Sequence, residues 1–507
     1  MRTLETLNHD PGLAALGEAY YSIVPPTPVG QPHLVAFNPD AAALIDLDPA
    51  QAARPGFVQI MAGNAPLPGG LQLSTVYAGH QFGVFVPQLG DGRAILIGQI
   101  RGTSEKAGRG ELWELQLKGA GKTPYSRFGD GRAVLRSTIR EYLCGEALHA
   151  LGIPTTRALC IVGSPDPVQR ESQETAAVLC RMAPSHLRFG HFEVFYYRNQ
   201  HDQLAPLADH VIDTYFPDLS RAWPASTVAQ RPVGAAHGRD RYTAWLIEVV
   251  ERTARLMAQW QAVGFCHGVM NSDNMSILGL TLDYGPYGFM EAFDAHYICN
   301  HSDDSGRYAY DQQPAIGHWN CSRLLQATLP LLADEPEQAV QAAYGILERY
   351  GPAFVAANLA RWRTKLGLRE ARESDPELVN ALLTILDRSK ADFTTVFRQL
   401  PDPAAARDHI ADVAAYDRWL EDYRARLGAE QSDDAGRAAR MNRVNPKFVL
   451  RNHLGEQAIQ RAKLKDFSQV NTLLTLLESP FDEHPGFDDY ADFPPAWASS
   501  IEISCSS

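Results

Sequence analysis

Two polar side chains in the stretch HGVMNSDNMSILGLTLDYGP, residues 267–286, have the chemistry of metal ligands. Asn274 and Asp283 flank the apolar run 275–282, which predicts a short strand between two loops. An amide oxygen and a carboxylate oxygen are hard ligands, and Mg²⁺ prefers them together with the phosphate oxygens of a nucleotide. Asn274 and Asp283 are therefore candidate oxygen ligands for a magnesium ion.

The order of these residues resembles the catalytic and metal-binding loops of protein kinases and aminoglycoside-type phosphotransferases. In kinases an Asn ends the catalytic loop and the Asp of a DFG triplet follows it; here the triplet is Asp283-Tyr284-Gly285. The kinase catalytic Asp lies five positions before the Asn, but Val269 stands there and cannot accept a proton. The nearby acid is Asp273. The metal-binding half of a kinase site is thus retained, and the acceptor half differs.

Residues 71–118 have the pattern of β-strands and contain two further candidates. Gly90-Asp91-Gly92-Arg93 lies between the apolar runs 83–86 and 94–97. Glycines there would let the backbone approach phosphates, although an Asp-Gly hairpin turn is the commoner origin of this pattern, and both interpretations stay open. The alternating run 112–118 predicts a strand ending at Lys118, where kinases place their phosphate-binding lysine.

A helix is predicted over residues 133–151, after Asp130-Gly131-Arg132. Glu141 lies near its centre. In kinases a glutamate of the first helix after the lysine strand pairs with that lysine. A solvent-facing glutamate is the alternative, but the order Lys118, Glu141, Asn274, Asp283 favours the ion pair.

Two more basic or glycine-rich features admit a phosphate-binding interpretation. Gly121-Lys122-Thr123 resembles the end of a P-loop, but the first glycine of that motif would be Gln116 and no helix follows directly, so we reject a P-loop. Arg181 and Arg188 surround a Pro-containing bend. Their guanidinium groups suit an anion site, or they pair with carboxylates of this acidic protein.

Composition limits the classes of protein to consider. The chain has 507 residues, 45% hydrophobic and 21% charged, with a formal charge of −13, which argues against a nucleic-acid partner. Seven cysteines are scattered without a C-x-x-C pair, which is typical of a reducing compartment. The N-terminus lacks the pattern of a signal or transit peptide, and no apolar run is long enough to cross a bilayer. A cytoplasmic protein without a membrane partner is expected.

The expected fold class is α+β, with a two-lobed protein-kinase-like architecture. Strand patterns dominate up to about residue 189 and helical patterns follow, including 245–263, 337–349, 354–366, 417–427 and 454–477. We expect five segments: an extended N-terminal wrapping segment (1–65), a β-rich lobe (66–189), a helical lobe with the catalytic and activation-like loops (190–330), a helical extension (331–480), and a tail with Cys505 (481–507).

Taken together, the sequence resembles the selenoprotein O (SelO) family of kinase-fold protein adenylyltransferases over nearly its whole length. The motifs that carry the resemblance are Tyr77-Ala78-Gly79-His80-Gln81-Phe82-Gly83, Gly90-Asp91-Gly92-Arg93, Gln116-Leu117-Lys118-Gly119, the 267–274 loop, Asp283-Tyr284-Gly285-Pro286, Asn445-Pro446, Val449-Leu450-Arg451-Asn452-His453 and Ser504-Cys505-Ser506-Ser507.

The resemblance implies transfer of AMP from ATP to Ser, Thr or Tyr hydroxyls of proteins, with Mg²⁺ (or Mn²⁺) and release of pyrophosphate. It implies a nucleotide that lies reversed relative to that of a kinase, so that the α-phosphate faces the acceptor. By motif, Lys118 and Glu141 form the ion pair at the phosphates, Asn274 and Asp283 bind the metal, and Asp273 accepts the proton. The residues implied to line the ATP site are Gly90, Gly92, Arg93, Lys118, Asp130, Gly131, Arg181, Arg188 and Asp283.

Some members of the family carry selenocysteine near the C-terminus, where this chain has Cys505. The resemblance therefore raises the hypothesis that Cys505 forms a disulfide with Cys299 in the activation-like loop and couples activity to redox state.

Two other functions stay open. The missing acid at position 269 also fits an inactive pseudokinase scaffold that binds nucleotide, and an ordinary kinase could use Asp273 as a displaced base. The complete set of Lys118, Glu141, Asn274 and Asp283 favours an active enzyme, which we expect to act as a monomer.

Overall fold

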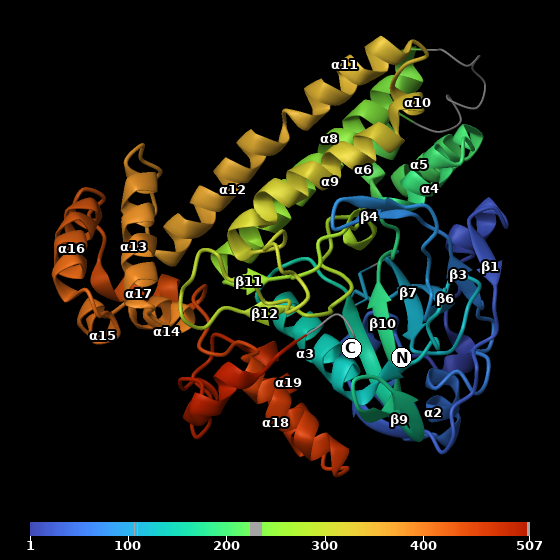
Figure 1. The fold of residues 1–507 in the computed structure, drawn as a ribbon, viewed down its shortest axis with the longest axis horizontal. Coiled ribbons are helices and arrows are strands. Elements are labelled where there is room, and N and C mark those ends of the chain that lie inside the picture. The colour runs from blue at the N-terminus through green and yellow to red at the C-terminus, as the bar shows by residue number, and fades with distance from the viewer. Residues whose placement is uncertain (106, 109, 224–235, 504–507) are drawn as a thin grey trace.

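An eight-stranded sheet lies at the centre of the β-rich half of the molecule (Figure 1). The computed structural model describes residues 1–105, 107–108, 110–223 and 236–503. The strand order is β1-β3-β6-β7-β10-β9-β2, with β8 paired to β10, and every pair is antiparallel. The strands are β1 Tyr21–Ile23, β2 His33–Phe37, β3 Leu73–Thr75, β6 Ala94–Arg101, β7 Leu112–Lys118, β8 Ala133–Val134, β9 Arg157–Gln169 and β10 Gln173–Ala183.

The N-terminal segment supplies the strands at both ends of this order. β1 pairs with β3, and β2 pairs with β9. Two short helices, α1 Pro39–Ala43 and α2 Pro55–Met61, follow. Before β1 the chain forms a short 3₁₀ turn over Gly12–Leu16, which ends at Gly17 (φ 96°).

A separate hairpin extends from the sheet toward the helices. β4 Gly79–Gln81 pairs with β5 Val84–Val86 through a two-residue turn. The hairpin interpretation of the 90–93 glycine loop is therefore wrong, since β5 pairs with β4 and not with β6. Asp91 ends the loop by accepting hydrogen bonds from the Thr75 backbone N–H (3.0 Å) and hydroxyl (2.6 Å).

Helix α3, Leu135–Ala150, packs on the sheet and carries Glu141. It begins two residues later than expected because Ala133 and Val134 pair with β10. Its orientation is fixed by a buried ion pair, in which Arg157 Nη2 of β9 lies 2.6 Å from Glu146 Oε2. Such a pair holds two elements in register, since either charge left alone in the interior would be costly.

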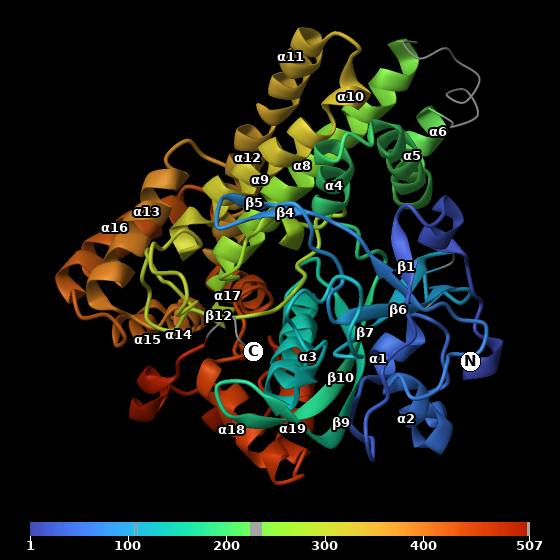
Figure 2. The ribbon, with the colours of Figure 1, turned by 45° about the vertical axis from the view of Figure 1, so that its right-hand side comes forward.

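Helices make up most of the chain after residue 189 (Figure 2). The long α8 packs beside α9 and α12, and the small β11–β12 ladder carries the loops of the site. The elements are α4 Gly190–Tyr197, α5 Leu204–Tyr215, α6 Pro217–Ala222, α8 Ala236–Ala262, β11 Phe265–Cys266, β12 Gly288–Phe289, α9 Gln313–Ala327, α10 Leu329–Leu332, α11 Pro336–Leu347, α12 Tyr350–Lys365, α13 Asp375–Ser389, α14 Phe393–Gln399, α15 Pro403–Arg407, α16 Val413–Gly428, α17 Asp434–Asn442, α18 Asn452–Lys463 and α19 Ser468–Glu478. The α+β class expected from the sequence is thus confirmed.

Two expectations about this half are wrong in detail. The apolar run 275–282 is no strand: Gly279 (φ 72°) turns the backbone, and only Ser276 and Thr281 make isolated bridges, to Arg188 and Thr155. The helical pattern 454–477 divides into α18 and α19, because Lys465 adopts a left-handed conformation (φ 62°).

The two last helices pack against α3. Leu473, Leu474 and Leu477 of α19 join the core that contains Tyr142 and Leu143 of α3. None of the helices in the described ranges has the length and apolar character needed to cross a membrane.

Candidate active site

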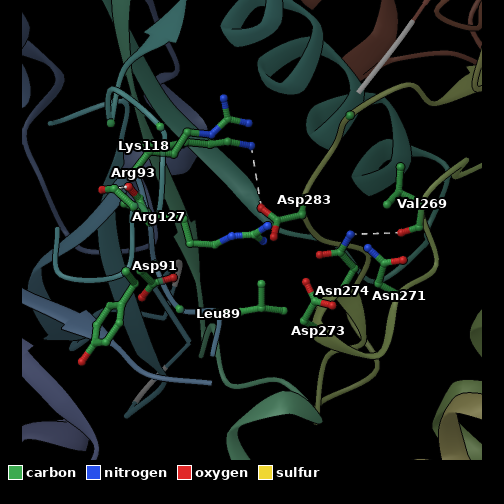
Figure 3. A pocket seen from close by; sticks show the side chains of 18 of the residues that line it. Leu89, Asp91, Arg93, Lys118, Arg127, Val269, Asn271, Asp273, Asn274 and Asp283 are labelled. Atoms are coloured by element: carbon green, nitrogen blue, oxygen red, sulfur yellow. Dashed lines mark hydrogen bonds and ion pairs between the residues drawn. The ribbon is translucent and has the colours of Figure 1, made fainter. Parts of the chain in front are cut away.

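A cavity of about 770 Å³ lies where the sheet meets the helical half (Figure 3). Figure 3 shows Arg93, Lys118 and Arg127 on the strand side, and Asn271, Asp273 and Asn274 on the opposite loop, with Asp283 between them. Other lining residues come from the 89–94 loop, the 125–132 loop and the ends of β10. The cavity therefore collects side chains from segments far apart in the sequence.

A buried charge network forms its floor. Lys118 at the end of β7 forms an ion pair with Glu141 of α3, and its Nζ lies 3.7 Å from Asp283 Oδ1. Arg181 Nη1 of β10 bridges the two carboxylates, at 3.2 Å from Glu141 Oε1 and 2.6 Å from Asp283 Oδ1. The structure thus brings the predicted lysine and glutamate together and adds Arg181 to the pair.

Asn274 and Asp283 converge on one point. Arg188 Nη1 donates to a carboxylate oxygen of Asp283 and lies 3.4 Å from Asn274 Oδ1. The Asn274 amide nitrogen donates to the Val269 carbonyl at 3.0 Å, which orients its oxygen toward Asp283. Val269 therefore contributes a backbone acceptor where a kinase has its catalytic acid.

This donor set fits a magnesium ion. Burial alone would raise the pKa of Asp283, but Arg188, Arg181 and Lys118 outweigh it and hold that pKa well below its usual range. Asp283 is therefore an anion at neutral pH, and Asn274 adds a neutral oxygen beside it. A carboxylate and an amide oxygen leave coordination positions for nucleotide phosphates, as Mg²⁺ requires.

Asp273 has a different environment from Asp283. Its side chain is buried, one oxygen accepts from Gln81 Nε2 at 3.2 Å, and the other has no hydrogen-bond partner. Burial raises the pKa of Asp273 to about 7, although the charge of Arg188 opposes the shift. A carboxylate with a free buried oxygen and a pKa near neutrality is suited to accept a proton.

The glycine loop and Arg93 form the sheet-side wall. A side chain at Gly90 (φ 139°) would meet the Tyr125 ring, and one at Gly92 would lie 2.8 Å from the Tyr125 carbonyl. Both glycines are thus required for close packing of two loops. Arg93 lines the cavity, and burial lowers the pKa of its guanidinium against the opposing charges of Glu141 and Asp283.

Asp130 and Gly131 lie at the rim of the cavity. Asp130 pairs with Arg170 (2.7 Å) and accepts from the Arg132 backbone N–H, so its role in this structure is to order the loop. Gly131 packs directly on Gly121. No P-loop is present, since turns follow Thr123 and the next helix is α3.

Several lining residues were missed by the sequence analysis. Arg127, Arg170 and the fully exposed Phe128 border the cavity, and Gln81 holds Asp273. The glycines of the 119–131 loop, directly after Lys118, were the available signal for Arg127 and Phe128, whereas Arg170 lies in the turn between β9 and β10 and had no such signal. For Gln81 the only signal was its place in the 77–83 motif.

Of the two cysteines in the redox hypothesis, the structure describes Cys299. Cys299 is a buried free thiol whose Sγ lies 3.3 Å from the Cys266 carbonyl oxygen, and burial raises its pKa. Cys505 lies outside the described residues. The carbonyl of Ile503, two positions before it, accepts a hydrogen bond from the His301 backbone N–H at 2.9 Å.

Comparisons with known proteins agree with one another. The family described as "Protein adenylyltransferase SelO" matches residues 3–478. The chain is 52% identical to the "Protein nucleotidyltransferase YdiU" of Burkholderia thailandensis, over 98% of this chain and 95% of that one. It is also 52% identical to proteins of the same name from Burkholderia mallei (100% and 96% covered) and Paraburkholderia xenovorans (97% and 94% covered).

Proposed function

The chain belongs to the SelO family of protein adenylyltransferases, and from this membership we propose that it transfers AMP from ATP to Ser, Thr or Tyr hydroxyls of proteins. The observation that carries the proposal is the cavity itself. It combines three buried cations, Lys118, Arg181 and Arg188, with an ionised Asp283. It also has a separate carboxyl, Asp273, whose pKa burial raises to about 7, and it has Val269 where a kinase has its catalytic acid.

We propose a kinase-like arrangement of the two halves. Residues 66–189 would form the β-rich lobe and residues 190–330 the helical lobe, with residues 1–65 wrapped around the sheet. The helical extension would span residues 331–480, and the tail 481–507. The placement of the cavity between sheet and helices, with Lys118 and Glu141 on one side and Asn274 on the other, supports this division.

The proposed reaction forms one P–O bond and breaks another. The acceptor hydroxyl oxygen attacks the α-phosphorus of ATP, the bond between the α-phosphorus and the α,β-bridging oxygen breaks, and pyrophosphate leaves. The hydroxyl proton goes to Asp273, one of whose oxygens has no hydrogen-bond partner among the described residues. A loose transition state of this kind depends mainly on positioning and charge stabilisation.

The chain's own residues supply both. Lys118, Arg181 and Arg188 are 7%, 2% and 1% exposed, so their charges act in a medium that screens them poorly. Glu141 keeps Lys118 and Arg181 at the floor of the cavity. Asn274 and Asp283 would hold Mg²⁺ (or Mn²⁺), which when bound would neutralise charge on the phosphates.

The test is an incubation of the reduced protein with Mg²⁺ and ATP labelled at either the α- or the γ-phosphate, with label on protein as the readout. Label from the α position alone is expected. Label from the γ position would make the protein a kinase. Label from neither position, with nucleotide binding intact, would favour the inactive pseudokinase scaffold, which the missing acid at position 269 also fits.

Activity should depend on pH through Asp273. Only the ionised carboxylate accepts a proton, so kcat/KM for AMP transfer is expected to rise with pH and level off above about 7. Asp273→Asn should lower the rate by about 10²-fold or more and remove the rising limb. An Asp273→Asn profile that keeps this limb would assign it to another group.

Stability should show the opposite dependence. The folded-state pKa of Asp273 lies above its ordinary value of 3.8, so the folded protein binds the proton more tightly than the unfolded chain. The resulting contribution to the free energy of unfolding is fully present below about pH 4 and is lost as the pH rises through about 7. Urea unfolding measures this effect. The free energy of unfolding of Asp273→Asn minus that of the wild type should be larger at pH 8 than at pH 4.

We further propose that the protein acts as a monomer in a reducing cytoplasm, where oxidation controls it. Among the described residues all six cysteines are free thiols. Exchange with oxidised glutathione would join Cys299 and Cys505, with two thiol protons and two electrons passing to the glutathione disulfide. Full labelling of both thiols after such oxidation would overturn this proposal, and Cys299→Ser is the matched control.

A further inference from the structure

A second cavity, of about 620 Å³, adjoins the first. Phe82 lines both cavities and so forms the wall between them. The second cavity is also lined by the activation-like loop (residues 284–310), with Ile298 and Arg307, and by the start of α9. The second cavity is therefore next to Asp273, since Gln81 beside Phe82 binds that carboxylate.

Phe82 is held in a strained conformation. It occupies the turn between β4 and β5 with φ 49°, a left-handed value that is unusual for a bulky side chain, and Gly83 follows at φ 85°. Its backbone N–H is fixed by the Tyr308 hydroxyl at 2.9 Å and by Asn271 Oδ1 at 3.3 Å. The residue nevertheless stays 42% exposed. The fold thus uses strain to present an aromatic ring at the rim of the site.

The β4–β5 hairpin is fixed firmly to the 267–274 loop. The His80 backbone N–H donates to the Ser272 hydroxyl at 2.7 Å, and Gly79 packs on Asp273 so closely that any side chain there would meet the carboxylate. Figure 2 shows β4 and β5 lying across from the sheet, beside α4. Phe82 therefore has a defined position relative to Asp273.

The second cavity also contains a cation, Arg307. Arg307 stacks on the Trp319 ring, with its Cζ 4.8 Å from the ring centroid, and its Nε is buried without a hydrogen bond. Among the described residues no Asp or Glu pairs with it. The acid on this wall, Asp311, lies 2.7 Å from His296. The exposed Ile298 (44%) adds an apolar surface.

We propose that this second cavity is the docking site for the acceptor polypeptide, and that it selects segments with an apolar residue beside the modified hydroxyl and an acidic residue further along. The inference rests on the proposed function. Phe82 and Ile298 would contact the apolar side chain, and Arg307 would pair with the acid. The modified hydroxyl would pass Gln81 to reach Asp273. Charge complementarity supports a polypeptide with acidic residues, since no carboxylate of the described residues pairs with Arg307.

The test measures preference between acceptors. One pair of synthetic peptides carries a Ser, Thr or Tyr beside Leu and differs only in having Glu or Lys further along. A third peptide replaces the Leu of the Glu peptide by Ala; α-labelled ATP supplies the AMP, with Mg²⁺ present. The wild type is expected to favour the Glu peptide by roughly fivefold in kcat/KM. Arg307→Glu should reverse the preference toward the Lys peptide, and Ile298→Ala should reduce discrimination between Leu and Ala beside the hydroxyl.

Arg323→Glu is the matched control, because Arg323 stacks on the same Trp319 ring (5.2 Å) but does not line the cavity. It should keep the wild-type preference. An unchanged preference in Arg307→Glu, with AMP transfer intact, would overturn the docking site and leave the proposed function standing. Absence of α-label on every peptide and on protein acceptors would instead overturn the proposed function.

Discussion

Replacing Asp283 by Asn is expected to lower the rate of AMP transfer by on the order of 10³-fold. The substitution keeps the size of the side chain but removes the charge that Arg181, Arg188 and Lys118 surround. It also removes the ionised ligand proposed for Mg²⁺. The measurement is transfer of α-label to protein under saturating Mg²⁺ and ATP.

Binding and catalysis should separate in this variant. The three cations remain, so ATP should still bind to Asp283→Asn, and its phosphates should stabilise the variant against heat because they compensate the lost carboxylate. Asp417→Asn, which removes an exposed carboxylate paired with Arg407, is the control and should keep full activity. Transfer by Asp283→Asn within tenfold of the wild type would exclude Asp283 as a metal ligand.

The second large effect is expected at Lys118. Lys118→Met should reduce AMP transfer by about 10²- to 10³-fold, because a buried ammonium stabilises charge on the phosphates far better than one in water. Glu141→Gln should have a smaller effect, since Glu141 acts by positioning Lys118 and Arg181 and touches no substrate in the proposed mechanism.

A double-mutant cycle tests this division of roles. If Glu141 acts through Lys118, the double variant should be about as slow as Lys118→Met alone, which is strong non-additivity. Glu141→Gln should also leave the pH profile set by Asp273 unchanged. Additive losses would mean that Glu141 contributes independently, for example by holding Arg181 alone.

The sequence predicted the order of the candidate site residues along the chain better than it predicted the structure around them. Lys118, Glu141, Asn274 and Asp283 could be found because each stands at a fixed place relative to a strand, a helix or a loop. Val269 could be recognised as a departure for the same reason. The α+β class followed from strand and helix periodicities, which are strong over β6, β7, α3 and α8.

The remainder depends on contacts between distant segments, which periodicity does not encode. The 275–282 run is apolar because it is buried, and its backbone groups bond to Pro154 and Leu187 instead of forming a ladder. Gln81 reaches Asp273 from 192 positions away. The pairing of β5 with β4 likewise depends on the strained turn at Phe82. A bulky residue does not indicate such a turn in a sequence.

The packing of α18 and α19 on α3 has a consequence for biosynthesis. The helix that carries Glu141 is made early, but the leucines of α19 that pack in its core, Leu473, Leu474 and Leu477, are made much later. Arg140, next to Glu141, also donates to the side chain of Asn452 at 3.4 Å. A nascent or C-terminally truncated chain would lack these contacts with α3. We expect α3 to reach its final packing only after α18 and α19 have been translated.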